Sequence, residues 1–252
     1  MDTKLKEPRP NRDHRVAVVI LAVAIIATVG AILVYQNRPI VDTTTTANAI
    51  TPPRYEWLRV SIIGDDYTYG SGAQPVDKYT EVLARQQCWK VNASAEVGTG
   101  FVKRGRNGTP YSDPARLDSV TTGDPELIVV QSSAADPATE QTAEQAELVF
   151  AGLRERAPDA FIVVLGPLDP PAIDDETIES LRSVLRVATE SAGLMFLDPL
   201  DPIAGVWIGQ NEYSSDGFAP NSSGHAGIAR RLASYLEHVP ELPRVYACDA
   251  VE

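Results

Sequence analysis

Several aspartates follow or precede the segments that would form the regular elements of an α/β fold, at positions where such folds bind ligands. Asp65 and Asp66 follow an apolar, β-branched run, 58–63, after one glycine. Asp136 follows the run 127–130, and Asp216 precedes the last amphipathic segment. Because α/β proteins bind ligands at the carboxyl ends of their strands, we expect Asp65, Asp66 and Asp216 to converge, with Asp136 as a further candidate. Unpaired carboxylates this close repel, raise one another's pKa or bind a cation. The sequence therefore raises the hypothesis of a weak divalent-cation or cationic-ligand site. The alternative is that Asp65 hydrogen-bonds the turn and Asp66 faces water.

Apolar runs alternate with helical patterns along the rest of the chain. The runs typical of buried strands are 58–63, 89–93, 127–130, 161–165 and 194–197. Helical spacing marks the segments 75–85, 139–156, 175–192 and 221–238. The segment 103–122, rich in Gly and Pro, is expected to be irregular. This alternation predicts a three-layer αβα fold with a five-stranded parallel sheet in flavodoxin-like order.

The run Gly64-Asp65-Asp66-Tyr67-Thr68-Tyr69-Gly70 is the first of four short blocks between residues 59 and 236. Together the four blocks resemble the SGNH, or GDSL, hydrolases, especially secreted or membrane-anchored actinobacterial members. In the family a nucleophilic Ser stands where this chain has Asp66. The second block is Gly98-Thr99-Gly100-Phe101. The resemblance implies that the N–H of either Gly98 or Gly100 is an oxyanion donor.

The last two blocks also depart from the family pattern. In Ser132-Ser133-Ala134-Ala135-Asp136, Ala135 stands at the Asn that completes the oxyanion hole. The fourth block is Asp216-Gly217-Phe218-Ala219-Pro220-Asn221-Ser222-Ser223-Gly224-His225. Ala219 stands there at the catalytic His, while Asp216, which orients that His in the family, is retained.

The resemblance thus implies an SGNH-hydrolase fold whose nucleophile, amide donor and base are all replaced. A carboxylate at Asp66 cannot replace the hydroxyl, and it would repel a developing oxyanion. We therefore expect a pseudoenzyme, a binding or scaffold module with an envelope glycan or a protein as partner. The alternatives are an active esterase with a non-standard catalytic set and a membrane-tethered structural subunit.

Other polar residues offer little replacement chemistry. The spacing of His225 within the last helical segment favours a packing role over that of a displaced base. Ser71, Ser132 and Ser133 lie in loops, where turn and cap hydrogen bonds are their usual role. No Cys/His cluster has metal-ligand spacing, and we expect no cofactor.

The N-terminal part of the chain predicts a membrane anchor. Residues 16–35, Val16 to Tyr35, form an uncharged apolar run long enough to span a bilayer as a helix. The preceding residues 1–15 are basic, which places them in the cytoplasm and the rest outside. Residues 36–54 are a Thr/Pro-rich linker to an extracytoplasmic domain, 55–252. A cleaved signal peptide is the alternative, with an A-x-A site at Ala47-Asn48-Ala49.

Charge and cysteine content restrict the partners and the compartment. The residues from 16 onward carry 17 basic and 31 acidic side chains, a net charge of −14. Such a surface repels phosphate backbones, so nucleic acid is not expected as a partner. Cys88 and Cys248 are the only cysteines, and outside the membrane they are expected either to form one disulfide or to stay two buried thiols.

Overall fold

A five-stranded parallel sheet lies at the centre of the computed structural model, which describes residues 57–203 and 205–242. Its strands are β1 (Leu58–Gly64), β2 (Trp89–Ala95), β3 (Leu127–Gln131), β4 (Phe161–Leu165) and β5 (Met195–Leu197). They are ordered β2-β1-β3-β4-β5, and every neighbouring pair is parallel. This confirms the flavodoxin-like sheet predicted from the alternation of strands and helices.

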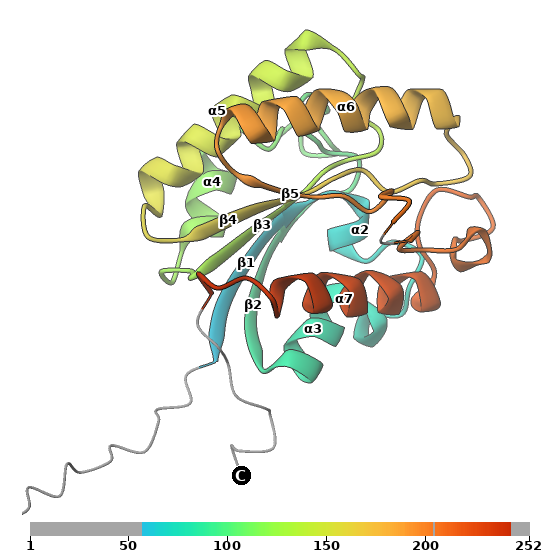
Figure 1. Cartoon of the computed structure of the whole chain (residues 1–252), viewed down its shortest axis with the longest axis horizontal. Helices are drawn as coiled ribbons and strands as arrows, with labels where there is room; N and C mark the ends of the chain where they lie inside the picture. The colour runs from blue at the N-terminus through green and yellow to red at the C-terminus, as the bar shows by residue number, and fades with distance from the viewer. Residues whose placement is uncertain (1–56, 204, 243–252) are drawn as a thin grey trace, which may run out of the picture. The chain divides into compact units, whose positions relative to one another are not determined.

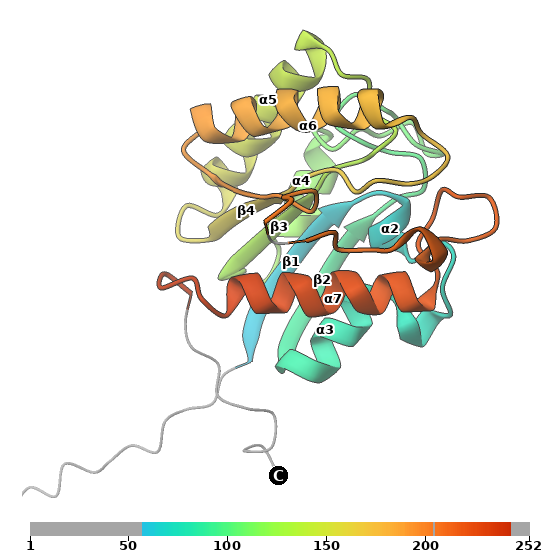
Figure 2. The ribbon, with the colours of Figure 1, turned by 45° about the vertical axis from the view of Figure 1, so that its right-hand side comes forward.

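Helices cover both faces of the sheet (Figures 1 and 2). One face carries α3 (Tyr79–Gln87) and α7 (Ser222–Leu236), and the other carries α4 (Pro114–Thr121), α5 (Glu140–Arg156) and α6 (Asp175–Ser191). Successive strand residues point to opposite faces, so β1 sends Val60 and Ile62 into one apolar cluster and Ile63 into the other. The three-layer arrangement leaves the carboxyl ends of the strands free for a site.

Two helices were not predicted. The four-residue α2 (Asp66–Tyr69) begins inside the turn after β1, and α4 lies within the segment expected to be irregular. The start of α4 has an ordinary physical cause, because Asp113 accepts a hydrogen bond from the N–H of Ala115 and Pro114 occupies the first helical position. Leu117 and Val120 then bury its apolar face.

The predicted cytoplasmic tail, membrane helix and linker lie outside the described residues. Within 57–203 and 205–242, no helix combines the length and apolarity needed to cross a bilayer. Cys88 is disulfide-bonded. Cys248 lies outside the described residues, so the pairing of the two stays a prediction.

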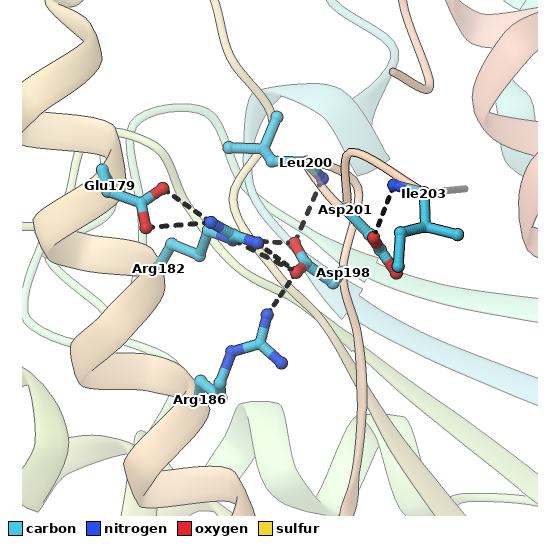
Figure 3. A network of polar contacts seen from close by, with 7 residues as sticks. All are labelled: Glu179, Arg182, Arg186, Asp198, Leu200, Asp201 and Ile203. Atoms are coloured by element: carbon cyan, nitrogen blue, oxygen red, sulfur yellow. Dashed lines mark hydrogen bonds and ion pairs between the residues drawn. The ribbon is translucent and has the colours of Figure 1, made fainter. Parts of the chain in front are cut away.

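Charged side chains tie the segment after β5 to α6 (Figure 3). The carboxylate of Asp198 accepts hydrogen bonds from Arg182 Nε and Nη2, at 2.9 and 2.6 Å, and from Arg186 Nη2. Its Oδ1 also accepts from the N–H of Leu200 at 3.1 Å. Burial alone would raise the pKa of Asp198, but the bonds from Arg182 and Leu200 outweigh it and hold this pKa below its usual value.

Asp198→Ala should therefore lower the free energy of unfolding by about 2 kcal/mol in urea denaturation, because it removes the acceptor that Arg182 and Arg186 share. Glu179→Ala is the matched control, since Glu179 binds the same Arg182 but is mostly exposed. It should cost less than about 1 kcal/mol. Equal losses in the two variants would mean that Asp198 does not hold this segment to α6.

Candidate functional site

The turn after β1 is built around a glycine that has no room for a side chain. A Cβ on Gly64 would lie 1.9 Å from Thr68 Oγ1 and 2.6 Å from Gln131 Oε1. Thr68 Oγ1 donates to Gln131 Oε1 at 3.0 Å, and the N–H of Asp65 donates to the same oxygen at 3.1 Å. The end of β1 is therefore locked to the end of β3, which positions the next residue, Asp66, at the edge of the sheet.

Asp65 is buried and caps α2. Its side chain is 3% exposed, and Oδ1 accepts from the N–H of Tyr67 at 3.0 Å. Burial raises the pKa of Asp65 to about 7, and the charge of Asp66 adds to this, while hydrogen bonds from Tyr67 and Ser133 oppose it. As the sequence suggested, Asp65 serves the turn.

The carboxylate of Asp66 accepts a hydrogen bond from a backbone amide of residues 98–101, the second block of the sequence, which we call the glycine loop. Its Oδ2 accepts from the N–H of Gly98 at 2.7 Å, and its Oδ1 accepts from Ser71 Oγ at 3.4 Å. The N–H of Gly100 instead donates to the carbonyl of Lys103 at 3.0 Å. Of the two glycines left open by the sequence, Gly98 is thus the one whose amide faces position 66, where a negative charge already occupies it.

The segment after β3 contributes no amide side chain to this place. Ala135 is half-buried, and its N–H donates to Ser133 Oγ at 3.3 Å. Asp136 is buried and accepts from the N–H groups of Phe101, Val102 and Lys103 at 2.7 to 3.0 Å. Burial raises its pKa, and the three N–H groups act in the opposite direction. Asp136 therefore holds the glycine loop and takes no part in a carboxylate cluster.

The loop before α7 lies near α2, to which it is joined by a hydrogen bond from the hydroxyl of Tyr67 to the carbonyl of Phe218 at 2.8 Å (Figure 2). Ala219 is buried, and its carbonyl accepts from both N and Oγ of Ser214. Asp216 is exposed and accepts from Ser214 Oγ at 2.6 Å and from the N–H of Phe218 at 2.9 Å. These bonds lower the pKa of Asp216 and turn it back into its own loop.

Asp65, Asp66 and Asp216, which the sequence suggested would converge, have separate hydrogen-bond partners in the structure. Each carboxylate accepts a hydrogen bond from a different backbone N–H group: Asp65 from Tyr67, Asp66 from Gly98 and Asp216 from Phe218. Across the described ranges, no group of three or more His, Cys, Asp or Glu side chains is placed to hold a metal ion.

His225 is a packing residue of α7. It is fully buried, its Nδ1 accepts from the N–H of Tyr79 at 3.3 Å, and its Nε2 lies 3.1 Å from the carbonyl oxygen of Ser71. A backbone N–H can only donate and a carbonyl can only accept, so the proton must be on Nε2 and the ring must be neutral. Burial lowers the pKa of His225, which agrees with this state.

Sequence reasoning missed the guanidinium that underlies the site. Arg116 on α4 is buried and donates to the carbonyls of Gly64 and Ser94 and to Thr99 Oγ1, at 2.8 to 3.0 Å. It also lies over the ring of Tyr111, 5.0 Å from the centroid. The ends of β1 and β2 and the glycine loop are thus joined by one side chain. A signal was its spacing from Val120, four residues later, which places both side chains on one face of α4.

Comparisons with known proteins agree with this geometry. Residues 62–226 match the model of the GDSL-like lipase/acylhydrolase family. A GDSL lipase of Mycobacterium tuberculosis is 29% identical over 197 residues, which cover 72% of this chain and 83% of that protein.

Solved structures share the fold at low identity. A protein from Lactobacillus plantarum aligns with a TM-score of 0.59 and 18% identity over 73% of this chain and 99% of its own. A family two carbohydrate esterase from Clostridium thermocellum aligns with a TM-score of 0.56 and 18% identity, again over 73% of this chain. The alignment spans 64% of that esterase. Because the family model covers well over half of the sequence, the chain belongs to the GDSL-like lipase/acylhydrolase family.

Proposed function

We propose that this chain is a catalytically inactive member of its family that serves as a binding or scaffold module of the cell envelope. The observation that carries the proposal is that the described histidine rings form hydrogen bonds with backbone groups and not with a hydroxyl. Of the three His residues of the chain, His225 and His238 are described. His225 has both ring nitrogens on backbone groups, and His238 Nδ1 lies 2.8 Å from the Ser234 carbonyl oxygen near the far end of α7.

The turn after β1 supports the same proposal. Acyl transfer needs a hydroxyl or thiol next to a base and an empty set of donors for the oxyanion. Here the side chain at Asp66 is a carboxylate, and it accepts the Gly98 N–H that would serve as a donor. Ala135 and Ala219, at the other two family positions, carry only methyl groups.

The proposed location rests on the apolar run near the N-terminus. The apolar run 16–35 would anchor the chain in the cell membrane as a single span, with the N-terminus cytoplasmic and the domain outside. A partner in the envelope, either a glycan or a protein, would then meet the domain on the outer side. A substrate known from relatives carries little weight here, because folds host many functions.

The purified full-length chain should show no turnover of p-nitrophenyl esters above buffer and no labelling by a fluorophosphonate probe. Ser71 is the hydroxyl to monitor, because its Oγ lies 3.4 Å from Asp66 Oδ1. An authentic active relative, assayed in parallel, shows that the assay works. Turnover abolished by Asp66→Asn, or probe attached to Ser71, would favour the competing function, an esterase with a non-standard catalytic set.

A further inference from the structure

The loop after β2 is a basic segment in an acidic protein. From Val97 to Ser112 there is no Asp or Glu, and the segment carries Lys103, Arg104 and Arg106. All three of these side chains are exposed, and none forms an ion pair with a described residue. We call residues 98–109 the cationic loop.

The carboxylates of Asp136 and Glu96 accept hydrogen bonds from the cationic loop and hold its main chain in place. Asp136, which is 2% exposed, accepts three successive N–H groups from residues 101–103. Glu96, at the end of β2, accepts from the N–H of Asn107 at 2.5 Å and from the hydroxyl of Thr109. Both carboxylates bind main-chain or hydroxyl groups of the loop, so they do not pair with its basic side chains. Arg104 Nη1 donates to the carbonyl of Gly108 at 3.4 Å, and Lys103 and Arg106 are exposed.

Main-chain contacts within the cationic loop complete the framework. Thr99 and Arg104 form an isolated antiparallel bridge, and the N–H of Gly105 donates to the carbonyl of Gly98 at 3.1 Å. Gly105 has φ +60°, and a Cβ there would lie 2.5 Å from Glu96 Oε1, so the bend requires glycine. A loop held by its backbone presents its charges in a fixed arrangement, which reduces the entropy lost on binding.

We propose that the cationic loop binds a linear anionic polysaccharide through Lys103, Arg104 and Arg106, the exposed basic side chains of the loop. The inference deepens the proposed binding role by naming its ligand class, and it rests on that role. The loop adjoins the turn after β1 through the bond between Gly98 and Asp66. Charge complementarity favours carboxylate or phosphate groups, which arginine binds well.

The charge distribution favours a narrow chain over an extended surface. An anionic bilayer would also approach the rest of the domain, and residues from 16 onward have a net charge of −14, which repels such a surface overall. A narrow, flexible polymer can contact the cationic loop without covering the rest of the domain. Single-stranded nucleic acid binds through exposed aromatic rings, but Phe101 and Tyr111, the two aromatic residues of this segment, are fully buried.

The test measures binding of the full-length chain, in a neutral detergent, to polygalacturonate and to phosphomannan, which distinguish carboxylate from phosphate. Neutral dextran, single-stranded DNA and micelles containing phosphatidylglycerol are the comparison ligands. The loop variant combines Lys103→Gln, Arg104→Gln and Arg106→Gln. The matched control combines Lys90→Gln, Arg154→Gln and Arg230→Gln, which removes three exposed cations elsewhere. Arg106→Glu alone is a second loop variant, in case the triple change affects folding.

We expect the chain to bind at least one of the two anionic polysaccharides and not to bind dextran. Binding should weaken as the salt concentration rises. The loop variant should bind roughly 10- to 100-fold more weakly, at up to about 1 kcal/mol for each exposed charge, and the control variant should lose less than about 3-fold. The proposal is overturned by no binding to either polysaccharide, by equal loss in the control, or by tighter binding to DNA or to the anionic micelles. None of these results bears on the absence of catalysis, because binding is measured without turnover.

Discussion

Asp66→Ser, Ala135→Asn and Ala219→His together should convert the chain into an ester hydrolase that reacts with a fluorophosphonate probe. The first change frees the N–H of Gly98, which now donates to the Asp66 carboxylate at 2.7 Å. The second adds a side-chain donor, and one such donor is typically worth about 10² to 10³ in rate. The third adds a general base, worth about 10² to 10⁴. We expect p-nitrophenyl acetate hydrolysis to rise at least about 10³-fold above that of the unmodified chain.

A matched control isolates the hydroxyl. The variant with Asp66→Ala, Ala135→Asn and Ala219→His has the same added amide and imidazole but no nucleophile, so it should neither turn over the ester nor bind the probe covalently. Circular dichroism and thermal melting would establish that both variants fold. A folded serine variant that stays inert would show that Asp66, Ala135 and Ala219 are not at the family's catalytic positions.

Asp65→Asn should remove a pH dependence of stability worth roughly 4 kcal/mol. The pKa of Asp65 is raised from 3.8 to about 7 by burial, so the folded state retains a proton that the unfolded state releases. Its stabilising contribution is complete below pH 3.8 and is lost as the pH rises to 7, at about 1.4 kcal/mol per pH unit. Asn cannot titrate, yet its side-chain oxygen still accepts from the N–H of Tyr67.

The measurement is the difference in the free energy of unfolding between Asp65→Asn and the unmodified chain, from urea titrations between pH 4 and pH 8. This difference should shift in favour of the variant across that range and level off above pH 7. Asp174→Asn is the control, because Asp174 caps α6 in the same way but is exposed and has a lowered pKa, which gives a dependence of opposite sign. A flat difference for Asp65→Asn would contradict the burial of this carboxyl.

Regular elements were predictable because their signals are local. The all-apolar runs of β3 and β4 and the helical spacing in α5 and α6 specify both type and position, within a residue or two at each end. The short helix α2 was missed because a single helical turn has no periodicity of its own. It forms because the buried Asp65 caps it and Gly70, at φ +94°, ends it.

The site was less predictable, since the direction of a polar side chain depends on which hydrogen-bond donors the fold places beside it. Sequence placed Asp136 and Asp216 near Asp66, but it could not show that Asp136 would bind the N–H groups of residues 101–103 or that Asp216 would bind that of Phe218. The choice between Gly98 and Gly100 depends on loop register, which spacing alone does not specify. Arg116 was missed for a similar reason, because its partners are mainly carbonyls of distant strand ends.

The interlocking of Gly64, Thr68 and Gln131 has a consequence for how such a protein changes over generations. A side chain larger than hydrogen at Gly64 collides with its neighbours, so that residue cannot drift while the fold is under selection. Position 66 makes no comparable demand, because its side chain points out of the framework toward Gly98. A substitution at position 66 can therefore change the functional group offered at this turn while the framework that holds the turn stays intact.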